Sequence, residues 1–287
     1  MADTIGPQKL RQTQADVHHI HIEPTRSWLS FRLKEMWLFR ELLFFLTWRD
    51  IKIRYKQTVL GFAWAILQPV MTMVVFSLFF GKLGKIPSEG LPYPIFNYAA
   101  LLPWQFFENS ITTSTTSLVT NANMVTKVYF PRLFVPIASV FSGLVDFFVA
   151  FTVLIGMMIY YQITPTVGVL LLPLFLLLAF ITAMGISLWM SALNVKYRDV
   201  RYIVPFLSRF WFFATPIAYP STLLSEPWRT LYGLNPMVGV VEGFRWALLG
   251  TQPPQAMMFL SILISIFLLI SGLVYFNRTE KTFADVI

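Results

Sequence analysis

The chain has 287 residues, of which 56% are hydrophobic and 13% charged, and its formal net charge is +8. A soluble domain carries about 25% charged residues, so this composition excludes an ordinary soluble protein and favours several membrane spans. The absence of Cys excludes disulfides and thiol catalysis. Because the cations flank apolar stretches, they favour orientation in a membrane over binding to nucleic acid.

The N-terminal part of the sequence predicts a tail followed by an interface helix. Residues 1–27 contain no apolar run of the signal-peptide kind. His18, His19 and His21 could hold a metal there, but a solvated tail is the simpler interpretation and no metal is expected.

Residues 28–57 predict an amphipathic helix lying in the membrane interface, because an apolar and a cationic stripe occupy neighbouring arcs of the helix. A helix packed on the rest of the protein is the alternative. The apolar stripe comprises Leu33, Trp37, Phe44, Trp48, Ile51 and Tyr55, and the charged stripe comprises Lys34, Glu41, Arg49, Lys52 and Lys56.

Six stretches are long enough to cross a hydrocarbon core of about 30 Å. The second of them is the most polar, since it contains Glu108, Asn109 and a run of hydroxyl residues at 112–117. These hydroxyls can bond back to the helix backbone or line a polar passage. The six stretches cover about 62–80, 94–119, 134–161, 167–193, 202–219 and 256–276.

Residues 220–254 are too broken by Pro, Gly and charge for a span, and too apolar for a solvated loop. They predict short re-entrant helices between the fifth and sixth spans, with a helical loop outside the membrane as the alternative. The expected fold is therefore an all-α integral membrane protein, with a six-span domain over 58–276 and a C-terminal tail over 277–287.

Lys and Arg lie unevenly around these spans. Ten precede the first span, and seven more follow the second, fourth and sixth spans. The opposite side has Lys82, Lys85, Arg229 and Arg245, while Arg209 falls within the fifth span. The positive-inside rule then places both termini in the cytoplasm.

Three ionisable residues fall inside predicted spans: Glu108, Asp146 and Arg209. Ionised groups at this depth are costly and usually face a bundle interior or an aqueous path. Asp146 or Glu108 could pair with Arg209. Such a pair could belong to a transport path or only hold helices together, and the sequence leaves both open.

Motifs for catalysis and for phosphate binding do not occur in the sequence. There is no GxxxxGK[ST], HExxH or GxSxG pattern. The sequence therefore does not indicate an enzyme, and no cofactor is expected in this chain.

Five stretches resemble, in the same order, the membrane subunits of bacterial ABC-type polysaccharide and polyol-phosphate exporters. These are the Wzm-like permeases of O-antigen, capsule and teichoic-acid export, and the resemblance covers about residues 30–276. The stretches are RDIKIRYKQTVLGFAWAILQP at 49–69, VYFPRLFVPIASV at 128–140, LVDFFVAF at 144–151, NVKYRDVRYIVPF at 194–206 and LNPMVGVVEGFRWALLG at 234–250.

The resemblance implies a homodimer in the bacterial inner membrane that works with two copies of a separate ATPase, which binds ATP and Mg. The substrate implied is a glycan, often linked to a polyprenyl diphosphate lipid. An exporter of lipo-oligosaccharides or drugs is the alternative within the same class. A membrane-embedded sugar-transferring enzyme and a passive channel or scaffold are alternatives from other classes.

The resemblance also assigns two groups of residues near the cytoplasmic face. A coupling helix that docks on the ATPase is expected over about 121–132, and cations before the first span would attract a lipid diphosphate. Anchoring to anionic lipid headgroups explains the same cations equally well. The coupling residues are Asn121, Asn123, Lys127, Tyr129 and Arg132, and the cations are Arg49, Lys52, Arg54, Lys56 and Arg198.

A third group is expected to line the channel. Aromatic rings can stack on the apolar faces of sugars, although an aromatic belt at the lipid interface is the alternative. The channel-lining candidates are Trp104, Phe106, Phe107, Asp146, Phe212 and Tyr219.

Overall fold

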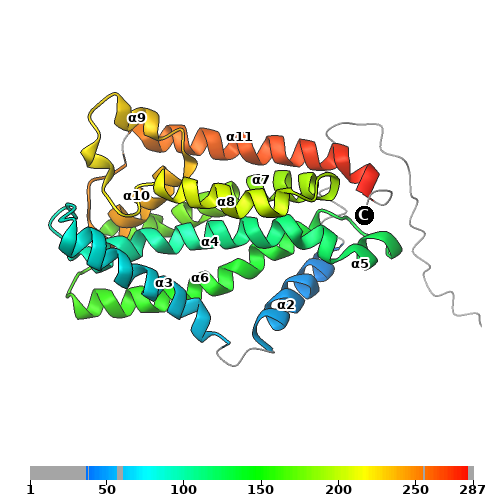
Figure 1. The fold of residues 1–287 in the computed structure, drawn as a ribbon, viewed down its shortest axis with the longest axis horizontal. Helices are drawn as coiled ribbons and strands as arrows, with labels where there is room; N and C mark the ends of the chain where they lie inside the picture. Colours follow the sequence, from blue (N-terminus) through cyan, green and yellow to red (C-terminus); the bar gives the residue numbers. More distant parts are fainter. Residues whose placement is uncertain (1–36, 38, 57–60, 255, 284–287) are drawn as a thin grey trace, which may run out of the picture. The chain divides into compact units, whose positions relative to one another are not determined.

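Every regular element that the computed structural model describes is a helix, which confirms the all-α prediction for that part of the chain (Figure 1). The described residues are 37, 39–56, 61–254 and 256–283. The helices in chain order are α2 (Arg40–Lys56), α3 (Ala63–Phe76), η1 (Ser77–Leu83), α4 (Tyr93–Thr120), α5 (Ala122–Lys127), α6 (Phe134–Tyr160), η2 (Val167–Leu171), α7 (Leu172–Lys196), α8 (Val200–Phe213), η3 (Ser221–Leu223), α9 (Trp228–Tyr232), α10 (Pro236–Leu249), α11 (Ala256–Thr279) and η4 (Glu280–Thr282).

Four of the helical segments are long and apolar enough to cross a membrane, and they confirm the first, third, fourth and sixth predicted spans. The predicted N-terminal tail, 1–27, and the first residues of the predicted interface helix, 28–36, lie outside the described residues. The four segments are Ala63–Leu83, Phe134–Tyr160, Val167–Lys196 and Ala256–Thr282.

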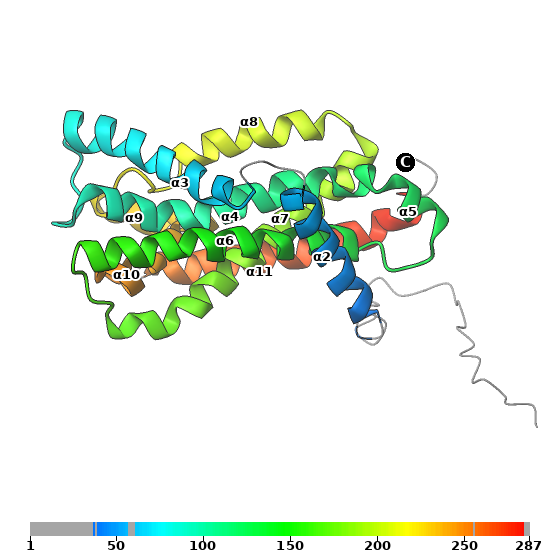
Figure 2. The same ribbon diagram turned by 90° about the horizontal axis from the view of Figure 1, so that it is seen from below.

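The second predicted span is α4, a helix of 28 residues at the centre of the bundle (Figures 1 and 2). It contacts α3, α6, α7, α8 and α10. These helices bury many of its polar side chains, whereas Gln105, Asn109 and Thr113 are only partly buried. In the hydroxyl run, Thr113 donates to the carbonyl oxygen of Asn109 and Thr115 to that of Ile111, each at 2.6 Å. These hydroxyls bond back to the backbone, as one of the two alternatives predicted.

The fifth predicted span is only partly helical, which corrects the expectation for 202–219. The helix α8 ends at Phe213 after 14 residues, or about 21 Å of rise. Pro216 follows closely, and a residue before proline is disfavoured in the α conformation. The next residues, Thr215 to Ala218, are buried in the bundle as irregular backbone.

Short helices form between the fifth and sixth spans, as predicted. The longest is α10, whose N-cap Asn235 accepts a 3.1 Å hydrogen bond from the Met237 backbone N–H. Pro236 occupies its first turn, and Gly250 ends it in the left-handed conformation at φ 73°. Nearly every side chain of α10 is buried against α4, α7 and α11.

The helices α7 and α11 approach closely because small residues line their seam. A Cβ added at Gly272 would lie 2.4 Å from the carbonyl oxygen of Gly185. Polar side chains reinforce the contact: the hydroxyls of Thr182 and Ser265 lie 2.8 Å apart, and Trp189 donates to Ser271 at 3.1 Å. Close backbone approach and paired polar side chains thus join the fourth and sixth spans along this seam.

The loops divide between two ends of the bundle. At one end lie α5, the turn after α7 and η4, and this end is called the α5 end below (Figure 1). The other end, called the α10 end, holds the turns after η1 and α6 together with α9 and α10.

We expect Gly272→Ala to lower the free energy of unfolding by about 1–3 kcal/mol, because the added methyl group has to displace backbone. Gly156→Ala is the matched control, since a Cβ there meets nothing within 4 Å. That change should leave stability equal or slightly higher, as alanine favours the helix. Thermal unfolding of both variants in one lipid mimetic checks this, and equal midpoints would contradict the close packing of α7 on α11.

Candidate functional site

A polar seam joins α2 to α6, and we call it the α2–α6 seam (Figure 2). On α6, Ser139, Ser142 and Asp146 follow one another at intervals of three and four residues, so they share one helix face. On α2, Asp50 and Arg54 have the matching spacing. Charged and hydroxyl groups of the two helices therefore meet along this seam, while Leu46 of α2 joins the hydrophobic core.

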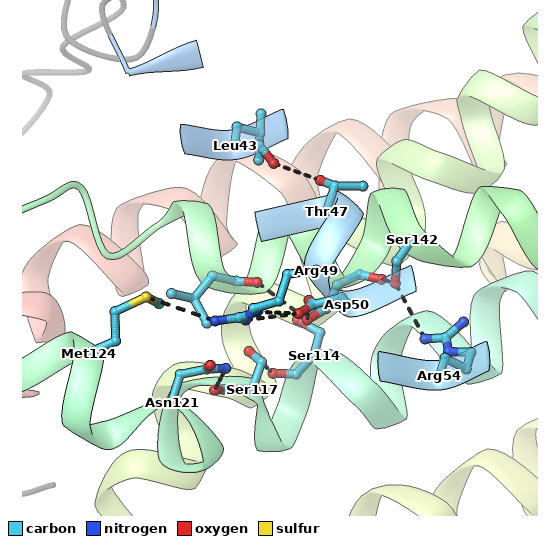
Figure 3. Close-up of polar contacts among 12 residues, drawn as sticks. Leu43, Thr47, Arg49, Asp50, Arg54, Ser114, Ser117, Asn121, Met124 and Ser142 are labelled. Atoms are coloured by element: carbon cyan, nitrogen blue, oxygen red, sulfur yellow. Dashed lines mark hydrogen bonds and ion pairs between the residues drawn. The ribbon is translucent and has the colours of Figure 1, made fainter. Parts of the chain in front are cut away.

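The α5 end of this seam is organised by Asp50. Its carboxylate accepts from Arg49 at 3.1 Å and 2.8 Å, and from the Ser139 hydroxyl at 3.5 Å. Figure 3 shows Arg49 extending toward Met124 of α5, whose sulfur accepts at 3.9 Å. The guanidinium is thus held between a carboxylate of its own helix and the coupling segment.

The other end of the seam is organised by Asp146. Arg54 forms an ion pair with one carboxylate oxygen, and the Tyr55 hydroxyl donates to the other. Arg54 also donates to the Ser142 hydroxyl at 3.3 Å (Figure 3). Asp146 lies 12 residues, or about 18 Å, from the start of α6, so α2 brings a cation deep into the bundle.

This pairing decides between the partners considered for Asp146. The structure pairs Asp146 with Arg54, 92 residues away, and Arg209 lies exposed on α8. Glu108 accepts a 3.2 Å hydrogen bond from the Trp104 indole. The suggested pairing of Arg209 with Asp146 is therefore wrong, because Arg54 of α2 occupies that carboxylate. The other suggested partner, Glu108, does interact electrostatically with Arg209.

The α2–α6 seam also changes the interpretation of the predicted interface helix. Trp37, Phe44 and Trp48 are 56–70% exposed, as expected of an apolar stripe at a surface. Phe45 and Ile53 are equally exposed, and the charged groups of the seam point into the bundle. The described part of the helix therefore lacks the predicted separation into an apolar and a cationic face.

Among the five predicted cations, two have acidic partners. Arg49 pairs with Asp50, and Arg54 pairs with Asp146. The other three, Lys52, Lys56 and Arg198, are exposed. The exposed three could attract a lipid headgroup, whereas Arg54 joins α2 to α6 and Arg49 pairs with the next residue of its own helix.

A cavity of about 340 Å³ lies between α2, α3, α4 and α6, and we call it the seam pocket. Arg54, Tyr55 and Asp146 form part of its wall. Phe106 and Asp146, two of the channel-lining candidates, line this pocket.

The remaining channel-lining candidates have other environments. Trp104 and Phe107 are fully buried, and they pack edge-on against Phe212 and Trp211 of α8. They join α4 to α8 and present no surface to a passing molecule in the single chain. Phe212 is half-buried in this cluster.

The last channel-lining candidate, Tyr219, lies at the α10 end. Its hydroxyl lies 2.8 Å from that of Tyr232 and donates to the Phe213 carbonyl at 3.0 Å. Burial raises the pKa of the Tyr232 phenol well above its ordinary value, with a further contribution from Tyr219. The contact between the two side chains closes the irregular backbone after α8.

The predicted coupling segment forms the short helix α5 at the α5 end. Asn123, Lys127 and Tyr129 are exposed, and Tyr129 is 61% exposed. Asn121 caps the preceding helix by donating to the Ser117 carbonyl at 2.8 Å. The segment therefore presents a cation and an aromatic ring to whatever lies beyond this end.

Arg132, the fifth coupling candidate, is tied to the end of α11. Its guanidinium donates to the Glu280 carbonyl at 2.6 Å, and its backbone N–H donates to the Glu280 carboxylate at 3.1 Å. This contact joins the predicted coupling segment to η4, directly after α11.

Arg245 is a buried structural cation that the sequence analysis had counted among the charges of the outer side. Its side chain is 0% exposed and stacks over Phe96, 3.7 Å from the ring centroid. Its three nitrogens donate to the carbonyl oxygens of Phe96, Pro216, Ile217 and Tyr219 and to the carboxylate of Glu242, at 2.6–3.3 Å. These acceptors explain why a charge can lie inside the bundle.

Sequence reasoning missed Glu242, Ser142 and Gln105. Glu242 and Arg245 lie three residues apart on α10, which is a pattern that exposed helices also show. Gln105, Asn109 and Thr113 recur every four residues on α4, and this spacing could have indicated a polar helix face.

A bundle of apolar helices around a polar central helix defines a multi-pass membrane protein. The chain belongs to the ABC-2 type transporter family, whose pattern matches residues 41–249. This match confirms the predicted resemblance to ABC-type export permeases.

Several relatives carry names from polysaccharide transport. The O-antigen export system permease protein RfbA of Myxococcus xanthus is 30% identical over 259 residues, covering 89% of this chain and 98% of that protein. A protein of the same name from Klebsiella pneumoniae is 27% identical over 248 residues, covering 86% and 95%. The polysialic acid transport protein KpsM of Escherichia coli is 24% identical over 209 residues, covering 70% and 78%. These names confirm a transport permease rather than an enzyme.

We expect Asp146→Ala to loosen α2 from α6, because Arg54 and Tyr55 then lose their shared acceptor. Opening of α2 should become easier by about 1–3 kcal/mol. Amide hydrogen exchange of residues 50–56 measures this opening. Asp199→Ala removes an exposed carboxylate and serves as the control; if it accelerates exchange in α2 as much, the seam does not hold the helix.

We expect Arg245→Met to destabilise the fold by on the order of 3–5 kcal/mol, because it leaves a buried carboxylate and four carbonyls without their donor. Arg245→Lys should recover only part of this loss, since an ammonium cannot reach all five acceptors. Thermal unfolding and the yield of folded protein are the measurements. Arg201→Met on the exposed face of α8 is the control, and an equal loss there would contradict a special role for Arg245.

Proposed function

We propose that this chain is the membrane-spanning half of an ATP-driven exporter that moves a polysaccharide from the cytoplasm across the bacterial inner membrane. The observation that carries the proposal is the nearly end-to-end match to an O-antigen export permease, which covers 98% of that relative. The more distant likeness to a polysialic acid transport protein favours glycan export as the shared activity. An O-antigen-type glycan linked to a polyprenyl diphosphate is the substrate we favour.

The proposed topology has six crossings within 58–276, with α4 as the second and α8 as the core of the fifth. The helix α4 is long enough, and protein covers many of its polar groups. The helix α8 covers about 21 Å, and the buried residues 215–218 extend the crossing. Short helices such as α10 then re-enter the membrane from the outer side.

The α5 end faces the cytoplasm in this proposal. Cations of this end include Lys127, Lys196, Arg198 and Arg278, and the positive-inside rule favours that orientation. Both terminal segments, 1–27 and 277–287, then lie in the cytoplasm, with 28–57 at the interface. Exposed Lys52 and Lys56 would attract anionic lipid headgroups or the diphosphate of the substrate.

Membership of the ABC-2 family implies a separate ATPase, which would bind ATP and Mg, so this chain needs no cofactor of its own. We propose that two copies of the chain form the channel and that two ATPase subunits dock on residues 121–132. Nucleotide-driven closure of the ATPase would move α5, and the Arg132–Glu280 link would carry the movement to α11.

Exposed apolar surface supports a homodimeric channel. Large apolar side chains of η1 and α8 are exposed, including Phe79, Phe206 and Phe210. Lipid or a second copy of the chain could cover them, and a channel between two copies needs the second. An exporter of lipo-oligosaccharides or drugs would use the same architecture and is the second candidate.

We expect Lys127→Glu combined with Tyr129→Ala to release the ATPase, because both side chains are exposed on the coupling segment. Truncating an aromatic hot spot typically costs roughly 2 kcal/mol or more, which would weaken the complex by at least about tenfold. The measurement is the amount of ATPase that co-purifies with the chain from native membranes.

The matched control is Lys82→Glu combined with Tyr160→Ala, two exposed positions at the α10 end. These changes should leave the ATPase bound. Equal retention of the ATPase by both variants would contradict docking on α5, and the absence of any ATPase from the unmodified preparation would contradict the exporter itself.

A further inference from the structure

The seam pocket has unpartnered polar groups on two of its walls. Gln105, Asn109 and Thr113 line it from α4, and Gln68 lines it from α3. The three α4 residues are spaced by four, so they form a ladder about 12 Å long on one helix face. The side-chain amides of Gln68, Gln105 and Asn109 have no hydrogen-bond partner among the described residues. Each amide can therefore offer two donors and one acceptor to a ligand.

The charge of the pocket wall is balanced. Arg54 and Asp146 are its ionisable groups besides Tyr55, and they are paired with each other. A diphosphate or a carboxylate would have to separate this pair before it could bind to Arg54, and Asp146 would repel it. The electrostatics of the pocket therefore favour an uncharged ligand.

Aromatic rings supply the remaining recognition surface. Trp64 of α3 and Phe106 of α4 line the same pocket as the amides. Sugar rings have a hydroxyl edge that amides and carboxylates bind, and C–H faces that stack on aromatic rings. The volume of about 340 Å³ lies in the usual range for small-molecule sites.

We propose that the seam pocket binds an uncharged sugar residue of the transported glycan, with Gln105 and Asn109 as the principal hydrogen-bonding groups. This inference rests on the proposed function. It places a sugar-binding site within one copy of the chain, beside α2, in addition to any channel between two copies. The Arg54–Asp146 pair then fixes the wall formed by α2, so the sugar site and the position of α2 depend on each other.

The chain has no cysteine of its own, which allows a direct test. Thr113→Cys puts one thiol in the pocket and keeps both amides, and Thr164→Cys puts one on the exposed turn after α6 as the control. The complete chain with its ATPase is placed in lipid nanodiscs, which carry no sugar headgroup. The rate of maleimide labelling is then measured with D-glucose, D-galactose, D-mannose or L-rhamnose in the buffer.

At least one of these sugars should slow labelling of Thr113→Cys, by about twofold when its concentration equals its Kd, and the effect should saturate. Thr164→Cys should label at an unchanged rate. Glycine betaine, an osmolyte without hydroxyl groups, should protect neither thiol. Protection by inorganic pyrophosphate instead of sugars would overturn the proposal in favour of an anion site, and equal rates under all conditions would overturn it outright.

Measuring glycan export distinguishes a failure of the proposed sugar site from a failure of the proposed transport function on which it rests. Gln105→Leu combined with Asn109→Leu removes the amides at similar volume and should reduce surface glycan severalfold. Asn277→Leu on α11 makes the same chemical change outside the pocket and should leave export unchanged. If deleting the chain abolishes surface glycan while the double variant exports normally, only the sugar site fails; if deletion has no effect, the proposed function fails.

Discussion

The structure depends on one constraint: a charge inside an apolar helix bundle has to find its counter-charge or its hydrogen bonds within the protein. Two arginines satisfy it in different ways. Arg245 distributes its donors over four carbonyls and Glu242, and so fixes α10 against α4 and the backbone after α8. Arg54 meets Asp146 and so fixes α2 against α6. These interactions position the helix before the first span and the longest of the short helices before the last.

The sequence predicted those structural features that depend on local hydropathy and on the spacing of residues along the chain. The four apolar spans, the short helices of 220–254 and the back-bonded threonines of α4 were within reach, because each depends on local composition and spacing. The end of α8 at Phe213 was missed because apolar residues continue beyond it. The partner of Asp146 was missed because it lies 92 residues away. Arg245 was counted as an outer charge because sequence alone gives no sign of its carbonyl acceptors.

The proposed transport function connects the features of the α5 end. Exposed Lys127 and Tyr129 form the surface for an ATPase, Arg132 links that surface to α11, and Arg49 touches Met124 beside it. A movement of α5 would therefore reach both the last span and the α2–α6 seam. The seam pocket lies at the other end of that seam, so docking of the ATPase and shape of the pocket are mechanically connected in this account.

The most direct test of the account is ATP-driven movement of glycan across a membrane by the purified components. The chain and its ATPase would be reconstituted in proteoliposomes with lipid-linked glycan from the same cells, and the glycan protected inside the vesicles would be measured over time. The account predicts that protected glycan increases when ATP and Mg are added to vesicles containing both proteins, and stays constant when either protein is omitted. Accumulation without ATP, or none with the complete system and active ATPase, would contradict it.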